Sequence, residues 1–108
     1  MLEPKLLGSF LNSMKNPFMY CDNDHMIRFM NKAALKHYKE GESLLGTSIF
    51  DCHNDISKEK ILEIYNRFTK GENEICIGVF KGEKITVVAV YGNNEEIIGY
   101  FERFEKAE

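Results

Sequence analysis

The first apolar pattern along the chain predicts a helix over residues 4–15. Pro4 suits the first helical turn, where its missing N–H costs no hydrogen bond. Asn16-Pro17 then stops the run, because a residue that precedes proline avoids the helical conformation. One amphipathic face is formed by the apolar side chains that recur at helical spacing, which are Leu7, Phe10, Leu11 and Met14.

The next segment alternates between short apolar runs and turn residues. Residues 18–21 and 26–30 are mostly apolar and rich in aromatic side chains. Asp22-Asn23-Asp24 between them is a strong turn signal, because Asp and Asn side chains bond nearby backbone groups. The two runs and their turn predict a β-hairpin.

The middle of the chain predicts short helical pieces. Asn31 suits the N-cap of a short helix over about residues 32–38, and Gly41 suits its end. The stretch 42–55 is partly apolar, but Gly46-Thr47-Ser48 interrupts any long helix. We therefore expect short helical turns joined by loops in this stretch.

The clearest helix of the sequence is predicted over residues 57–70. Ser57 can serve as its N-cap, and Glu59 places a negative charge in the positive first turn. Lys70-Gly71 is typical of a helix end. One apolar stripe is formed by Ile61, Ile64, Tyr65 and Phe68.

After Gly71 the apolar period changes from that of a helix to that of a strand. Residues 74–80, 84–91 and 96–104 are rich in β-forming residues, and short turn segments separate them. The order is then a helix, two strands, several helices and three strands. This order predicts an α+β fold, in which helices pack on one face of a five-stranded antiparallel sheet and an amphipathic helix precedes the sheet.

Composition restricts the class of protein. The 108 residues suffice for one domain, and 44% hydrophobic content excludes intrinsic disorder. With 14 basic and 17 acidic residues the chain lacks the basic excess of a nucleic-acid binder. No apolar run reaches the roughly 18 residues of a membrane helix, and MLEPKLLGSF lacks the pattern of a signal peptide. We expect a cytoplasmic protein that binds neither nucleic acid nor membranes.

Neither the cysteines nor the catalytic motifs indicate an enzyme. Cys21, Cys52 and Cys76 fit neither a disulfide framework nor a zinc site, because they are widely spaced and odd in number. The sequence contains no Gly-rich phosphate loop and no nucleophile elbow. We expect no catalytic residues. His25 and His37 are expected to be solvated, the first in a turn and the second near the end of a short helix.

Taken in order, several of these pieces resemble the PAS domain family over essentially the entire chain. The family pattern has a strand ending in Asp, a second strand ending in Asn and an Ala-rich short helix. A Leu-Leu-Gly step, a connecting helix ending in Gly and a last strand with an apolar-Gly-apolar step then follow. The matching segments here are Phe18 to Asp22, Met26 to Asn31, Lys32-Ala33-Ala34, Leu44-Leu45-Gly46, Ser57 to Gly71 and Ile97-Ile98-Gly99-Tyr100.

The resemblance implies a sensory or interaction module. Residues 17–106 would form the PAS-like domain, and residues 1–16 an N-terminal helix of the kind through which such domains commonly form homodimers. The sheet and the middle helices would enclose a pocket for haem, flavin or a small metabolite, and signals would pass to a downstream signalling protein. The pocket residues we predict are Ile49, Phe50, Cys52, His53, Ile64 and Phe68.

Asp51-Cys52-His53-Asn54 is the most distinctive local feature. Haem-binding members of the family ligate iron by a histidine from this helical region, and both imidazole and thiolate are good axial ligands. His53 is therefore our candidate for a metal ligand, restricted to haem iron. The alternative that Cys52 is a buried apolar residue and His53 bonds locally stays open.

The flavin-photochemical members of the family need a reactive cysteine in an Asn-Cys-Arg motif. Ile49 occupies that position here, so we expect no covalent flavin chemistry, whereas non-covalent flavin binding stays open. The sequence thus predicts a ligand-binding sensor whose ligand shifts a conformational equilibrium. The two alternatives are a haem-based sensor that uses His53 and an interaction or dimerisation module without a ligand.

Overall fold

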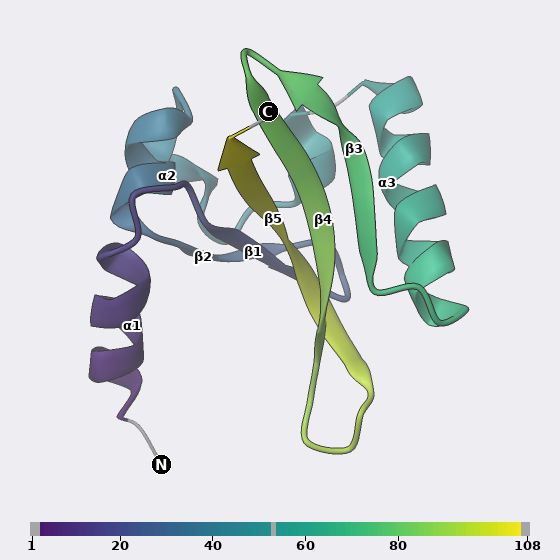
Figure 1. Ribbon diagram of the computed structural model, residues 1–108, viewed down its shortest axis with the longest axis horizontal. Helices are drawn as coiled ribbons and strands as arrows, with labels where there is room; N and C mark the ends of the chain where they lie inside the picture. The colour runs from purple at the N-terminus through teal and green to yellow at the C-terminus, as the bar shows by residue number, and fades with distance from the viewer. Residues whose placement is uncertain (1–2, 53, 107–108) are drawn as a thin grey trace.

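The computed structural model describes residues 3–52 and 54–106. The described part of the chain begins with one helix and a hairpin (Figure 1). It continues through a short α-helix, two 3-10 helices and a longer α-helix, and it ends with three strands. The elements in order are α1 (Pro4–Asn12), β1 (Met19–Asp22), β2 (Ile27–Met30), α2 (Lys32–His37), the 3-10 helices η1 (Gly41–Leu44) and η2 (Ile49–Cys52), α3 (Asp55–Thr69), β3 (Glu74–Phe80), β4 (Glu83–Tyr91) and β5 (Ile97–Lys106).

The five strands form one antiparallel sheet in the order β2-β1-β5-β4-β3. The last strand lies in the middle of the sheet, between the first strand and β4. Its pairing with β1 joins the two halves of the sequence, with Tyr20 opposite Phe101 and Cys21 opposite Tyr100. The predicted α+β fold with a five-stranded antiparallel sheet is confirmed.

The C-terminal strands also agree with the sequence pattern to within two residues. Residues 84–91 and 96–104 were expected as strands, and the structure has Glu83–Tyr91 and Ile97–Lys106. Lys81 and Gly82 join β3 to β4 with φ angles of 51° and 81°. Two consecutive positive φ angles are typical of the tight hairpin turns whose twist matches that of the strands.

α1 ends at Asn12 rather than at residue 15. The Asn12 side-chain oxygen accepts a hydrogen bond from the backbone N–H of Lys32, at 2.9 Å. This tertiary bond holds the end of α1 against the start of α2. The apolar spacing of the sequence does not encode it.

The start of α3 is also different from the predicted start. The helix begins at Asp55, and Asn54 rather than Ser57 is its N-cap, because the Asn54 side-chain oxygen accepts from the backbone N–H of Ser57 at 2.9 Å. Asn and Ser are about equally good N-caps, so residue type alone could not decide between them. Asp55 takes the place in the first turn that we expected Glu59 to occupy.

Asn31 caps α2, as the sequence predicts, and does more. Its side-chain oxygen accepts from the N–H groups of Ala34 and Phe18, both at 2.9 Å. Its amide group donates to the carbonyl oxygens of Leu11 and Asn16. The fully buried Asn31 therefore fastens the end of α1 and the linker that follows it to the start of α2.

Gly41 does not end α2, which stops at His37, but begins η1 with a φ of 54°. Tyr38 is already extended, with a ψ of 131°. The short helical turns expected between residues 42 and 55 are η1 and η2.

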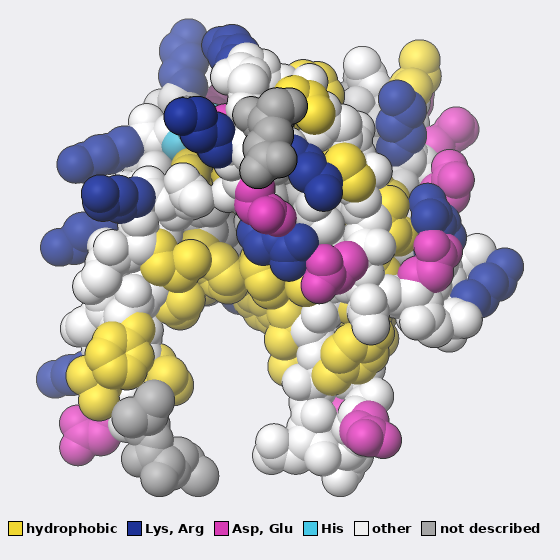
Figure 2. Space-filling model, viewed as in Figure 1, with side chains coloured by type: hydrophobic (Ala, Val, Ile, Leu, Met, Phe, Trp, Pro, Cys, Tyr) yellow, Lys and Arg dark blue, Asp and Glu magenta, His cyan; other side chains and the backbone are white. Residues whose placement is uncertain are grey.

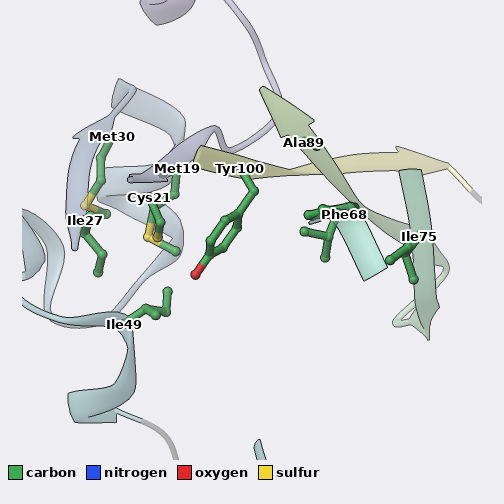
Figure 3. Packing of buried hydrophobic residues seen from close by; sticks show 11 residues of the cluster. Met19, Cys21, Ile27, Met30, Ile49, Phe68, Ile75, Ala89 and Tyr100 are labelled. Atoms are coloured by element: carbon green, nitrogen blue, oxygen red, sulfur yellow. The ribbon is translucent and has the colours of Figure 1, made fainter. Parts of the chain in front are cut away.

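The hydrophobic core lies between the sheet and the helices that cover one face of it (Figure 3). Phe68 of α3 and Ile49 of η2 are buried, and Ile61 and Ile64 pack against this cluster. α1 contributes no buried residue. No helix in the described ranges 3–52 and 54–106 is long and apolar enough to cross a membrane.

Candidate functional site

A cleft of about 590 Å³ opens between α3 and the sheet. Its volume lies within the range of about 300–1,000 Å³ that is typical of small-molecule sites. The apolar stripe of α3 forms one wall, because Ile61, Ile64 and Phe68 follow one another at helical spacing on its inner face. Ile75 of β3 and Val87 of β4, which are paired neighbours in the sheet, form the other wall.

The structure brings together three of the six pocket residues that we predicted. Ile49, Ile64 and Phe68 line the cleft. Phe50 lies beside them, with its ring 4.8 Å from the ring of His25. His53 and the side chain of Cys52 lie outside the described part of the chain. The binding roles of these residues, and haem ligation by His53, stay predictions.

Four charged residues also line the cleft. Lys60 and Glu63 of α3 are exposed. The Arg67 guanidinium makes two bonds to the carboxylate of Glu72, at 2.6 and 2.7 Å, so it is directed to a partner outside the cleft. Glu102 of β5 is half-buried and also lines the cleft.

His25 is buried, and our expectation that it is solvated was wrong. Only 8% of its surface is exposed. Its backbone N–H donates to the Asp22 carbonyl at 2.9 Å, and its own carbonyl accepts from the N–H of Ile49 at 2.8 Å. Its φ of 63° turns the chain inward, and histidine is one of the residues that tolerate this left-handed conformation. The β1–β2 turn is thereby anchored to η2.

The His25 side chain lies among aromatic rings from three elements. Its Nδ1 is hydrogen-bonded to the hydroxyl of Tyr100, at 2.8 Å. Ring centroids of Phe50, Tyr65 and Tyr100 lie 4.8, 5.1 and 5.7 Å from its own. Burial lowers the pKa of His25 below its ordinary value, although the carboxylates of Asp22 and Asp24 oppose this effect. The imidazole is therefore neutral near pH 7.

Tyr100 connects this cluster to the cleft. It lines the cleft, is 8% exposed and extends from the centre of β5 with its hydroxyl pointing away from the strand, toward Ile49 (Figure 3). Burial is the main reason that the pKa of Tyr100 is raised far above its ordinary value, with the nearby Cys21 thiol adding to it. The hydroxyl thus stays protonated and neutral.

His37 is exposed, as predicted, and its ring lies 5.5 Å from that of Phe104. Within residues 3–52 and 54–106 no group of three or more His, Cys, Asp or Glu side chains could hold a metal ion. Sequence reasoning missed Tyr100 and His25 as parts of the site. The only signal for Tyr100 was its place in Ile97-Ile98-Gly99-Tyr100, the segment that matches the apolar-Gly-apolar step of the last strand in the family pattern.

Solved structures share this arrangement at low sequence identity. A C-terminal domain from Streptococcus mutans matches with a TM-score of 0.78 and 17% identity, over 97% of this chain and 85% of that chain. The PAS domain of a protein from Colwellia psychrerythraea matches with a TM-score of 0.70 and 16% identity, over 94% of each chain. The Aer2 receptor from Vibrio cholerae, described as a dual PAS-haem oxygen sensor, matches with a TM-score of 0.57 and 18% identity, over 95% of this chain and 99% of that chain.

An open antiparallel sheet with helices on one face and a cleft between α3 and the sheet defines the class of the fold as α+β. The family model described as PAS domain matches residues 7–104, from within α1 to the end of β5. The chain therefore belongs to the PAS domain family, whose members are sensory and signalling modules. A search of curated proteins found no match to this sequence.

Proposed function

We propose that this PAS domain senses a small, mainly apolar molecule that binds in the cleft between α3 and the sheet. The observation that carries the proposal is the cleft itself, with about 590 Å³ of space between walls of Ile, Val and Phe side chains. Burying a ligand against these walls removes apolar surface from water, which contributes roughly 25 cal/mol per Å².

The signal would be a shift between two arrangements of α3 and the sheet. A ligand can favour one arrangement only by binding it more tightly than the other. β5 contributes Tyr100 to the cleft and pairs with both β1 and β4, so a change at the cleft reaches strands of both halves of the sheet.

The test fills the cleft from α3. Ile64→Trp adds bulk to a residue that lines the cleft, whereas Leu62→Trp adds the same side chain at an exposed position of the same helix. We expect purified wild-type protein and Leu62→Trp to carry a bound small molecule in native mass spectrometry, and Ile64→Trp to lose it. An absorption spectrum of the same sample would identify haem or flavin.

Wild-type protein without any bound molecule, together with an Ile64→Trp variant of unchanged stability, would contradict the proposal. It would favour the alternative of an interaction module without a ligand.

We also infer that the protein forms a homodimer through α1. The inference is supported by the apolar face of α1, where Leu6, Leu7 and Phe10 are each 42–53% exposed, and by Met14 just after the helix, which is 44% exposed. Figure 2 shows hydrophobic side chains on α1 beside a hollow between this helix and the β4–β5 hairpin. A second copy of the chain would cover the same face on both helices, because two-fold interfaces are self-complementary.

Phe10→Asp combined with Leu11→Asp tests this role. We expect light scattering to give the mass of a dimer for wild-type protein and of a monomer for the double variant. Ser9→Asp, on an exposed polar residue of the same helix, is the control and should remain dimeric. An unchanged mass of the double variant would count against dimerisation through α1.

A further inference from the structure

Tyr100 differs from its neighbours in the cleft. The buried residues that line the cleft are Ile49, Phe68, Ile75, Val87 and Tyr100. Tyr100 alone among these described residues carries a polar side-chain atom. A ligand that reaches the buried end of the cleft therefore meets one hydroxyl group among hydrocarbon side chains.

The direction of this hydroxyl is fixed by His25. A phenol group has one donor and two acceptor positions. The bond to His25 Nδ1 at 2.8 Å occupies one of them, and the hydrogen bond with the Cys21 thiol occupies another, so one position remains for a ligand. Without His25 the hydroxyl would keep only its weak bond to the thiol, and a ligand would have to fix its direction on binding.

His25 is not itself a lining residue, but it holds three residues that are. Its imidazole is hydrogen-bonded to the Tyr100 hydroxyl and packs edge-to-face on the ring of Tyr65. Its backbone carbonyl accepts a hydrogen bond from the N–H of Ile49. A left-handed backbone conformation and the burial of an imidazole each cost free energy. The hydrogen bond to the Tyr100 hydroxyl offsets part of the cost of burying the imidazole.

The chemistry of this end of the cleft selects against a charged ligand group. The Tyr100 hydroxyl is neutral, and the neutral His25 imidazole behind it supplies no counter-charge. A carboxylate or ammonium group placed here would lose its hydration, and the carboxylates of Glu102 and Asp22, which raise the pKa of Tyr100, would also repel an anion.

We propose that the ligand of the cleft is an uncharged molecule with an apolar body and one hydroxyl or carbonyl oxygen that hydrogen-bonds to Tyr100, and that His25 is the positioning residue for that bond. This proposal rests on the proposed function, since it requires that the cleft binds a small molecule. It goes further by naming the chemical class and the residue pair that recognises it.

The test uses three probes that share one apolar body: naphthalene, 2-naphthol and 2-naphthoate. Fluorescence titration of the full chain gives the dissociation constant of each. We expect 2-naphthol to bind wild-type protein about 2- to 10-fold more tightly than naphthalene, as one net hydrogen bond contributes. The 2-naphthoate anion should bind more weakly than both.

Tyr100→Phe should bring the affinity ratio of 2-naphthol to naphthalene close to one and keep the affinity for naphthalene. Tyr91→Phe, at an exposed residue of β4, is the matched control and should keep the ratio. His25→Asn retains a residue that tolerates the positive φ but cannot replace the imidazole. This substitution should lower the ratio of the two affinities by a larger factor than it lowers the affinity for naphthalene. Loss of a merely structural residue would instead lower the affinities for naphthalene and 2-naphthol equally.

The outcomes separate the two proposals. Equal binding of naphthalene and 2-naphthol to wild-type protein, or a ratio that survives in Tyr100→Phe, would overturn the recognition by Tyr100 and leave the cleft intact. A ratio that His25→Asn leaves unchanged would overturn the positioning role. If none of the probes binds wild-type protein, the proposed function itself fails.

Discussion

α1 and α3 are both amphipathic helices, but their apolar faces have different surroundings. Phe68 of α3 is 3% exposed and packs into the core between helix and sheet. Phe10 of α1 is 53% exposed, and no residue of α1 is buried. Both faces are recognisable in the sequence from the same spacing of apolar residues.

The difference shows that an apolar stripe predicts a helix but not the surface that covers it. α3 is covered by β3 and β4 of its own chain, and the incomplete fit between them leaves the cleft. α1 is fastened at its end by Asn31 and presents its apolar face outward. This difference is the basis of our proposals that α3 forms a wall of a ligand site and that α1 contacts a second chain.

The largest expected difference between the two helices is in their contribution to stability. Phe68→Ala should lower the free energy of unfolding by about 3–5 kcal/mol, because it leaves a cavity in the core. Phe10→Ala should change it by less than about 0.5 kcal/mol, at a protein concentration where the chain is monomeric. Urea denaturation of both variants measures this difference, and similar losses would show that α1 is packed more tightly than the structure indicates.

A smaller effect is expected from the asparagine caps of α2 and α3. Asn31→Ala removes four hydrogen bonds of a fully buried side chain and should lower the free energy of unfolding by about 2–3 kcal/mol. Asn54→Ala removes only the exposed cap of α3 and should lower it by about 1 kcal/mol. Equal losses in thermal or urea unfolding would contradict the role of Asn31 in fastening α1.

The smallest expected effect depends on pH and involves His25. Its pKa is lowered by burial in the folded chain, so the unfolded chain binds a proton at higher pH than the folded chain. Stability from this residue should therefore be complete above about pH 6.5 and be lost as the pH falls below that value. We expect His25→Asn to reduce the slope of unfolding free energy against pH between about pH 7 and 5.5. An identical slope would contradict the neutral buried state.

The elements that the sequence predicted well are those with long periodic patterns. β3, β4, β5 and α3 have many residues that repeat one pattern, so a shift of one or two residues at an end changes little. Short signals were less reliable, since either Asn54 or Ser57 satisfies the chemistry of an N-cap. The packing around each candidate decides between them.

The candidate site was predicted only in part. Ile64 and Phe68 lie on a recognisable stripe, and Ile49 follows the Gly46-Thr47-Ser48 interruption. His25 could not be placed, because its burial depends on Tyr100, which is 75 residues further along the chain. A polar turn around it suggests exposure, and local sequence carries no sign of the distant partner.

The central position of β5 has a consequence for synthesis of the chain. β1 and β2 form a two-stranded hairpin whose remaining neighbour in the sheet is the strand translated last. An isolated two-stranded hairpin is marginally stable in water. On the ribosome this hairpin, with the aromatic residues Tyr20 and Phe29, therefore has to wait for β5. Until β5 emerges, the edge of β1 is unpaired and can pair with another chain.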